Sequence, residues 1–208
     1  MKNLVVILVI FIFNCTYSQI IENYGFKIGV SYSKIDRDYK KLEFDYETKH
    51  KFGVSFSAFA ISHISSNIKL FTEFGFAQKG FSEEYIKTNV NGEQIGTFLY
   101  KESINYLTLK LLPHYEIGIN SVTPFIFLGP KIDIKLGNNS NDEEFSFGKI
   151  SKDIQLGVCY GVGVEVTELI KYPFIIELSS SYDFSDSFEN DFLRLKNISY
   201  ELTIGFKF

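Results

Sequence analysis

The sequence predicts an all-β protein, an eight-stranded antiparallel up-and-down transmembrane β-barrel. Three observations support this fold class. Eight segments of the 208-residue chain alternate apolar and polar side chains with the period of two that a strand with one apolar face requires. The connections between these segments are alternately long and short, and the chain opens with a segment typical of an export signal. A membrane barrel accounts for all three features, whereas a soluble barrel has no reason to sort its loops by length.

The first 18 residues are expected to be a signal peptide, so residues 19–208 would form one mature barrel domain. Lys2 supplies a positive start, residues 4–13 are an apolar run, and residues 16–18 resemble a small-x-small cleavage site. The run is too short for a helix, which needs about 20 residues to span a bilayer. No other stretch approaches that length, so we expect insertion by strands.

The first four predicted strands are residues 24–33, 51–61, 68–80 and 104–116. Three apolar side chains fall on the polar faces of these strands, namely Phe59, Ile61 and Phe71. The fourth strand has mixed faces, with leucines at 107, 109 and 111 opposite Tyr106, Thr108, Lys110 and Leu112. Residues 81–103 are predicted to be a long polar loop, in which the Asn91-Gly92 pair signals a tight turn and a small projecting hairpin.

The last four predicted strands are residues 124–136, 153–166, 174–183 and 197–208. The sixth alternates most regularly, and the eighth, NISYELTIGFKF, ends the sequence on an apolar aromatic residue. The long loops are residues 34–50, 81–103, 137–152 and 184–196, and the other connections are short turns. Eight strands enclose room only for side chains, so the apolar faces must point outward into lipid. A content of 22 Phe and 13 Tyr suits the aromatic girdles of such barrels.

The charge and the cysteine content limit which partners and which covalent links are expected of the chain. The net charge of −4, which becomes −5 without Lys2, disfavours nucleic acid. Cys15 lies in the predicted signal and Cys159 remains alone, so the mature domain has no intramolecular disulfide. Lipidation at Cys15 is the less favoured alternative, because bulky residues precede it. Cys159 is expected to face the lumen as an inert small residue, and we expect no cofactor.

Nine charged side chains are predicted to face the lumen and to form a charge network: Lys27, Lys69, Glu73, Lys131, Asp133, Glu165, Glu177, Glu201 and Lys207. A lumen too narrow for continuous water forces such charges to pair and to form hydrogen bonds. A salt-bridged plug is therefore favoured over an ion path with a gate. Inward-facing glycines at 157, 161 and 163 are expected to make room for large neighbours, and a pore constriction is the less favoured alternative.

Catalytic and metal sites find little support. His50, His63 and His114 are the histidines of the chain, and only His50 falls near the outer leaflet, where a lipid-hydrolysing barrel would place its catalytic set. No nucleophile motif accompanies it, so a surface histidine is favoured and no enzyme is expected. No cluster of His or Cys suggests a metal site, and the acidic run at residues 141–144 is expected to be a solvated loop rather than a calcium site.

Several strands resemble the outer-membrane β-barrel proteins of Bacteroidetes usually called PorT-like, which belong to the porin family of Gram-negative bacteria. The matching segments, in order, are residues 73–80 (EFGFAQKG), 105–109 (NYLTL), 124–130 (PFIFLGP) and 161–165 (GVGVE). Lys110 stands where that family often has proline. The resemblance covers nearly the whole mature chain and implies an OmpA/OmpX-like barrel in a bacterial outer membrane, without implying the secretion role of the family's namesake.

These observations together favour a structural or surface-interaction protein with a plugged, charged lumen that acts through its extracellular loops. A narrow porin-like channel for small solutes and an accessory role in protein secretion are the alternatives. Both termini are expected in the periplasm. Gly205, Phe206 and Phe208 are expected to be the signal read by the outer-membrane assembly machinery. The other expected partners are outer-membrane lipid and an unidentified extracellular molecule, and the barrel is expected to be a monomer.

Overall fold

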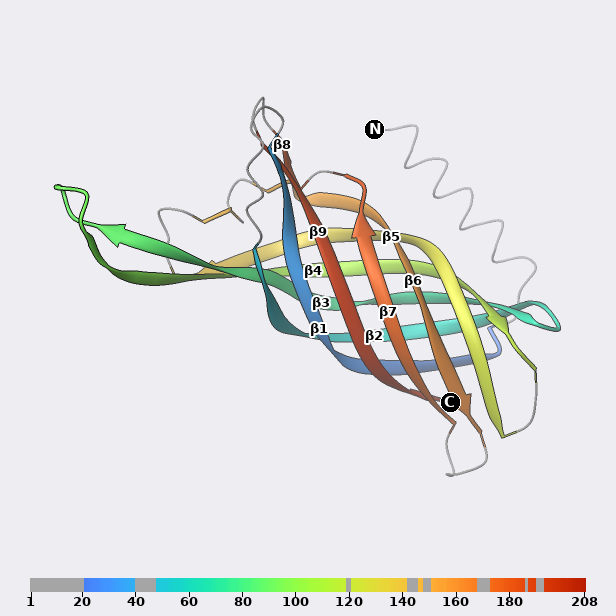
Figure 1. Cartoon of the computed structure of the whole chain (residues 1–208). Coiled ribbons are helices and arrows are strands. Elements are labelled where there is room, and N and C mark those ends of the chain that lie inside the picture. The colour runs from blue at the N-terminus through green and yellow to red at the C-terminus, as the bar shows by residue number, and fades with distance from the viewer. Residues whose placement is uncertain are drawn as a thin grey trace, which may run out of the picture.

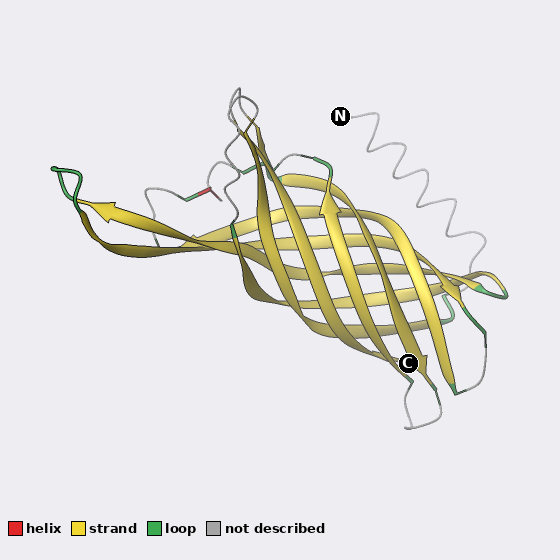
Figure 2. Cartoon of the chain, in the orientation of Figure 1, coloured by secondary structure: helices red, strands yellow, loops and turns green. Residues whose placement is uncertain are grey.

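The computed structural model describes residues 21–39, 48–118, 121–141, 146–147, 151–167, 173–185, 187–189 and 193–208. The predicted signal peptide, residues 1–18, and residues 142–144 of the acidic run lie outside them. Strands make up most of the described chain, and they wind around a common axis (Figure 2). None of the described residues belongs to a helix long and apolar enough to cross a membrane.

The strands form one antiparallel sheet (Figure 1). They are β1 (Asn23–Tyr39), β2 (Lys49–Ser65), β3 (Ile68–Thr88), β4 (Gln94–Glu116), β5 (Val122–Ser140), β6 (Ile154–Val166), β7 (Phe174–Asp183), β8 (Phe188–Glu189) and β9 (Leu193–Lys207). Their order is β1-β2-β3-β4-β5-β6-β7-β9-β8, and β1 also pairs with β9. Because β8 has two residues and only extends the β9 pairing, the ring has the eight strands predicted.

The pairing of β1 with β9 closes the barrel. It runs without interruption from Gly25 opposite Lys207 to Tyr39 opposite Leu193. Beyond it, the backbone N–H of Phe208 donates to the carbonyl of Tyr24 at 2.8 Å. A closed sheet leaves no row of unpaired backbone groups, which a bilayer could not solvate.

The barrel has two different ends. The terminal end carries Asn23, Phe208 and the connections β2–β3, β4–β5 and β6–β7, and the hairpin end carries the connections β1–β2, β3–β4, β5–β6 and β7–β9. Figure 1 shows the β3–β4 hairpin projecting well beyond the rest of the barrel, at the end away from the C-terminus. The connections at the hairpin end are the ones that the sequence predicted to be long.

The prediction of a polar loop at residues 81–103 is wrong for most of that segment. β3 continues to Thr88, β4 begins at Gln94, and the two pair throughout. The tight turn predicted at Asn91-Gly92 is confirmed, because Gly92 has a φ of 81° and its N–H donates to the Asn89 carbonyl at 3.0 Å. The reason for the error is that polar outward side chains in this segment, such as Ser82 and Glu84, hide the alternation.

The two faces of the wall differ as predicted. Outward-facing Phe52 and Ile28 are 72% and 62% exposed, whereas inward-facing Ser31 and Tyr106 are both 0% exposed. The same alternation assigns the faces of the fourth predicted strand, which lies within β4. Its residues Tyr106, Thr108 and Leu112 are buried in the lumen, so its leucines at 107, 109 and 111 face outward. The outward positions of the eight strands therefore make a continuous apolar belt of the kind that faces hydrocarbon.

Candidate functional site

The lumen collects most of the polar and charged side chains of the strands, because every second residue of each strand points into it. Among the described residues, buried lysines, glutamates and aspartates come from β1, β3, β4, β5, β6, β7 and β9. They lie in layers along the barrel axis, and apolar layers near each end separate the middle charges from the outside.

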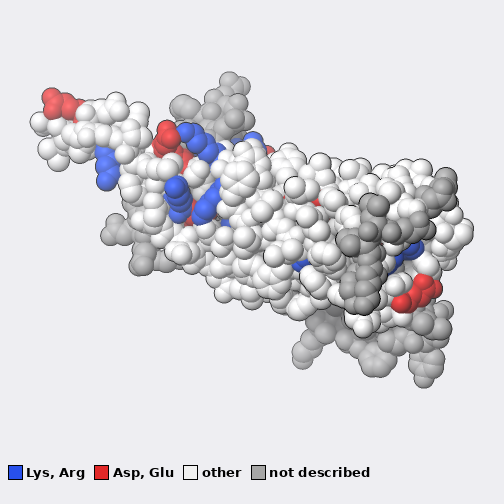
Figure 3. Space-filling view, turned by 90° about the horizontal axis from the view of Figure 1, so that it is seen from below, with Lys and Arg blue, Asp and Glu red and all other residues white. Residues whose placement is uncertain are grey.

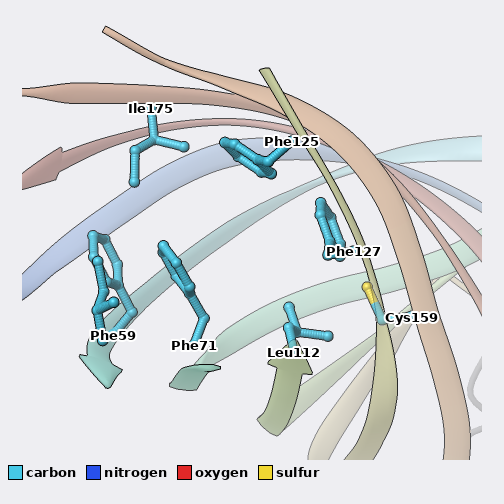
Figure 4. Close-up of a cluster of buried hydrophobic side chains, with 8 residues drawn as sticks. Phe59, Phe71, Leu112, Phe125, Phe127, Cys159 and Ile175 are labelled. Carbon is cyan, nitrogen blue, oxygen red and sulfur yellow. The ribbon is translucent and has the colours of Figure 1, made fainter. Parts of the chain in front are cut away.

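The apolar layer near the terminal end is an inner cluster of Phe59, Ile61, Phe71, Leu112, Phe125, Phe127, Cys159 and Ile175. Figure 4 shows these side chains converging on one another from strands on opposite sides of the barrel. Phe59 and Phe71 stack with ring centroids 5.5 Å apart. The three residues that broke the predicted pattern, Phe59, Ile61 and Phe71, are therefore core residues of this layer.

His114 belongs to the same layer and packs as an aromatic ring. Its ring centroid lies 3.8 Å from that of Phe71, 4.7 Å from Phe125 and 4.8 Å from Phe127. Neither ring nitrogen has a hydrogen-bond partner among the described residues. These contacts favour packing rather than proton transfer as the role of this side chain.

Lys27 lies against the inner cluster and joins two carboxylates. Its Nζ is 5.2 Å from the Phe59 ring centroid and 5.1 Å from that of Phe71. The same Nζ donates to both oxygens of Glu177 at 2.7 Å and to Glu73. All three groups are nearly inaccessible to solvent, so each carboxylate depends on one ammonium for its compensation.

Two further ion-pair groups occupy the middle of the lumen. Lys110 Nζ lies 2.9 Å from Glu201 Oε2. Oδ2 of Asp133 forms ion pairs with Nζ of Lys79 at 2.5 Å and with Nζ of Lys131 at 2.7 Å. Nζ of Lys131 also lies 2.8 Å from Oδ1 of Asp183. Charges of both signs thus alternate across the lumen.

Ion pairs also line the terminal mouth of the lumen. Nζ of Lys69 lies 2.5 Å from the carboxylate of Glu116 and 3.8 Å from that of Glu165. Glu165 also forms an ion pair with Lys207. These residues come from the ends of β3, β4, β6 and β9. The inner cluster therefore has paired charges on both sides along the axis.

Hydrogen-bonded polar groups and a second apolar layer fill the other half. The Tyr106 hydroxyl accepts a hydrogen bond from Nε2 of Gln155 at 3.0 Å, and Nδ2 of Asn197 donates a hydrogen bond to Oε1 of Gln155 at 2.6 Å. Beyond them lies the hairpin-end cluster of Ile35, Phe81, Tyr100 and Leu195, with Phe98 and Phe147 packed against it. Arg37 crosses this cluster, 5.1 Å above the Phe147 ring, and makes a two-point contact with Glu83 at 2.9 and 2.5 Å.

A cavity of about 20 Å³ remains in the middle of the lumen. Lys27, Glu73, Lys110 and Cys159 are among the residues that line it. Such a volume admits roughly one water molecule, which needs at least about 10–15 Å³. The cavity is therefore about the size of one water molecule.

Inward glycines make room for the large side chains, as predicted. A Cβ at Gly163 would lie 2.4 Å from Cζ of Phe125, and one at Gly161 would lie 2.6 Å from Cζ of Phe127. A Cβ at Gly157 would lie 2.6 Å from Oδ1 of Asp183. The missing side chains on β6 thus admit both the rings of β5 and a lumen ion pair.

The structure places all nine of the predicted network residues on the inner face and brings them into separate groups. Lys27, Glu73 and Glu177 form one, Lys131 and Asp133 another, and Lys69, Glu165 and Lys207 a third, while Glu201 pairs with Lys110. Sequence reasoning missed Lys79, Lys110, Glu116 and Asp183 as members. Each of them occupies a position that points into the lumen in the two-residue alternation of its strand. That alternation was the signal that could have found them.

The remaining histidines lie on the outside. His50 stacks on Tyr32 with ring centroids 4.4 Å apart, and Nδ1 of His63 lies 2.6 Å from Glu22. Cys159 is a buried free cysteine. Among the residues that the structure describes, no group of three or more His, Cys, Asp or Glu side chains is arranged to hold a metal ion.

The residues of the predicted assembly signal lie at the closing seam. Phe206 and Phe208 pack on Phe26 from outside, with ring centroids 5.7 and 5.9 Å away. Gly205 faces inward, where a Cβ would lie 2.8 Å from Cγ of Lys27. The outward aromatic rings therefore belong to the apolar belt at the terminal end.

Comparisons with known proteins agree with this architecture. Residues 18–189 match the model of the outer membrane protein beta-barrel domain family. The outer membrane protein OprG from Pseudomonas aeruginosa is similar in structure, with a TM-score of 0.50 at 11% identity, over 89% of this chain and 95% of that one. The attachment invasion locus protein Ail of Yersinia pestis matches with a TM-score of 0.45 at 18% identity, over 89% and 98%.

Neisserial surface protein A matches with a TM-score of 0.49 at 10% identity, over 89% of this chain and 97% of that one. No curated protein sequence matches the chain. The family match spans most of the chain, and its members are barrels of the bacterial outer membrane. The chain belongs to the outer membrane protein beta-barrel domain family.

Proposed function

We propose that the protein is a closed outer-membrane barrel that acts as a structural or surface-interaction protein through its hairpin end, and not as an open channel. The packing of the lumen carries this proposal. Two apolar layers and several ion-pair groups fill the interior, and the cavity between them has a volume of about 20 Å³. An eight-stranded barrel encloses just enough space for its own side chains.

Opening a path for ions would be costly. A conducting pore would have to separate buried pairs such as Lys27 with Glu177 and Lys131 with Asp183, and also displace the stacked rings of the inner cluster. Separation of one buried pair costs on the order of 3–5 kcal/mol, because an uncompensated charge is left behind. A narrow porin-like channel is therefore the less favoured function.

The hairpin end supplies the surface for interaction. Bacterial barrels carry their longer loops outside the cell and their short turns in the periplasm, which puts the hairpin outside and the termini inside. Beyond the barrel wall the β3–β4 hairpin exposes Ile86 and Ile95, at 64% and 65%, and the tip residue Val90. Exposed apolar side chains on a projecting two-stranded ribbon are suited to contact with another molecule.

The same geometry supports the partners that we propose. Lipid surrounds the apolar belt, the assembly machinery reads the closing strand, and the closed ring needs no second copy. The strand motifs at residues 73–80, 124–130 and 161–165 support placement in the PorT-like group of Bacteroidetes. An accessory role in secretion rests on that likeness alone, and the positions of His50, His63 and His114 give no support to a catalytic role.

Planar-bilayer recording tests the proposal. Refolded protein that migrates as a heat-modifiable band is expected to insert without steady single-channel steps, while a conducting porin reconstituted in the same way shows them. Reproducible unitary steps from the wild-type protein, absent from protein-free controls, would overturn the closed-barrel function in favour of a channel.

A further inference from the structure

Three lysines gather on the outer face of β2, β3 and β4, just beyond the apolar belt on the side of the hairpin. Lys49 and Lys51 come from β2 and Lys101 comes from β4. Figure 3 shows Lys and Arg side chains, with some Asp and Glu side chains beside them, where the hairpin leaves the barrel, next to a belt with few charged atoms. We call the residues Lys49, Lys51 and Lys101 the outer cationic patch.

An irregularity in β2 lets Lys51 join this patch. The β2–β3 register shifts between His50 and Ser55, so that the alternation of faces is interrupted at Lys51. Lys51 Nζ donates to the hydroxyl of Ser103 on β4 and thus crosses β3. Ser103 and Lys101 face outward, because the neighbouring Glu102 and Ile104 are buried in the lumen. Gly80, paired with Ser103, has no side chain to block the crossing.

The patch is short of negative charge. Lys49 lies 2.7 Å from Glu84, in a solvent-exposed pair. Neither Lys51 nor Lys101 has a carboxylate within ion-pair distance among the described residues. The Lys101 charge repels the Lys51 ammonium, and the lumen carboxylate of Glu102 attracts it more weakly. Two neighbouring ammonium groups that make no ion pair on the outer face, beside a hydroxyl group, are suited to a phosphate group.

An apolar groove of about 590 Å³ runs along the outer face below the patch. Phe26, Phe56, Ala58, Phe74, Phe76 and Leu107 are among the residues that line it. The small side chain of Ala58 lies between Phe26 and Phe74, its register partners on β1 and β3, and so makes the floor of the groove. Its volume and its mostly apolar lining are suited to a hydrocarbon chain.

The two features lie at the spacing of one lipid molecule. Gly80 and Ser103 lie four residues beyond Phe76 and Leu107, which is about 13 Å along a strand. At a strand tilt of about 40° this is roughly 10 Å along the membrane normal. That distance reaches from the hydrocarbon into the headgroup layer. Gln78 and Asn105, which hydrogen bond to each other at 3.1 Å, mark the boundary between the two.

We propose that this face is a specific site for a phosphorylated outer-leaflet lipid, with its phosphate on Lys51 and Lys101 and one acyl chain in the groove over Ala58. The placement in the outer leaflet rests on the orientation proposed above. The site itself does not depend on whether the barrel conducts, so its failure and the failure of the closed-barrel function are separate results.

Binding of diphosphoryl lipid A to the full-length barrel in detergent, followed by native mass spectrometry, tests the site. Wild-type protein is expected to bind this lipid more tightly than the same lipid after dephosphorylation. The double variant Lys51→Gln/Lys101→Gln is expected to bind about tenfold more weakly or worse, the loss of about one charge-assisted contact. Ala58→Phe fills the groove and is expected to weaken binding of both lipids.

Lys87→Gln is the control, because it removes one positive charge by the same kind of substitution from the exposed far part of the hairpin, away from the patch. It is expected to bind like the wild type. Equal binding by the double lysine variant and the wild type would overturn the site, as would equal binding of the dephosphorylated lipid. Inorganic phosphate at millimolar concentration is expected not to compete. Full competition would reduce the patch to a simple anion site and overturn the lipid proposal.

Discussion

Lys27 shows how one residue holds the middle of the lumen together. It contacts Glu73 and Glu177 and also lies over two phenyl rings of the inner cluster. Burial makes each charge dependent on its partner, because water cannot replace the ammonium once it is removed. The same group therefore joins the charge network to the apolar layer.

Lys27→Ala is expected to destabilise the refolded barrel by about 3–5 kcal/mol, because two buried carboxylates lose their counter-charge. Lys49→Ala is the matched control. Its pair with Glu84 is 61% and 51% exposed and should contribute no more than about 1 kcal/mol. Urea unfolding in detergent, followed by circular dichroism, measures both. A loss for Lys27→Ala no larger than for Lys49→Ala would contradict the buried network.

At the scale of single residues, the sequence predicts correctly which face of a strand a side chain occupies. It does not predict which side chains fill the lumen. Lys27, Glu73 and Glu177 were placed on the inner face by period two alone. Phe59 and Phe71 interrupt the alternation of polar and apolar side chains, because the lumen contains an apolar layer as well as charged ones. They lie near the same turn, so their proximity was the available sign of an apolar layer at that end.

The β3–β4 hairpin shows why strand lengths were underestimated. Outside the hydrocarbon the outward face of a strand need not be apolar, so Ser82, Glu84 and Lys101 erase the contrast between the faces. The inward positions kept the pattern, with Phe81, Glu83, Tyr100 and Glu102 all buried. Inward parity followed past residue 80 would have extended both strands.

The last strand combines closure with an aromatic end. Phe208 exchanges two backbone hydrogen bonds with Tyr24 and makes ring contacts with Tyr24 and Phe26. Each such hydrogen bond contributes about 0.5–1.5 kcal/mol, so the two together are smaller than a typical domain stability of about 5–15 kcal/mol. A large defect after loss of Phe208 would therefore come from recognition during assembly and not from stability.

Deletion of Phe208 is expected to lower the amount of folded barrel in outer membranes several-fold, while the purified truncated chain still refolds in detergent. Heat-modifiable migration in membrane fractions and in refolded samples measures the two effects. Phe184→Ala, which removes an exposed ring at the other end, is the control and should assemble normally. Undiminished assembly of the truncated chain would remove the proposed role of the C-terminal aromatic residue.

For the whole molecule, the sorting of connections between the two ends predicts its direction in the membrane. The tip of the β3–β4 hairpin and the β2–β3 turn lie at opposite ends of the barrel. Long loops outside and short turns inside put the first at the cell surface and the second in the periplasm.

An epitope inserted between Asn91 and Gly92 is therefore expected to bind antibody on intact cells. The same epitope between Ser66 and Asn67, in the β2–β3 turn, is the matched control and should be reached only after the outer membrane is permeabilised. Immunofluorescence with and without permeabilisation makes the comparison. The reverse pattern would invert the orientation and place the outer cationic patch in the inner leaflet.

Local sequence was enough to determine the number of strands in the ring, the apolar outer face and the closure of the sheet. Period two assigns each side chain to a face, and the bilayer permits no open edge. Which charges meet was decided only by the tertiary structure. Lys27 and Glu177 are 150 positions apart in sequence, and Lys51 reaches Ser103 across an intervening strand. Such contacts depend on the stagger of the whole ring, which sums the registers of all eight strands, so no single segment encodes them.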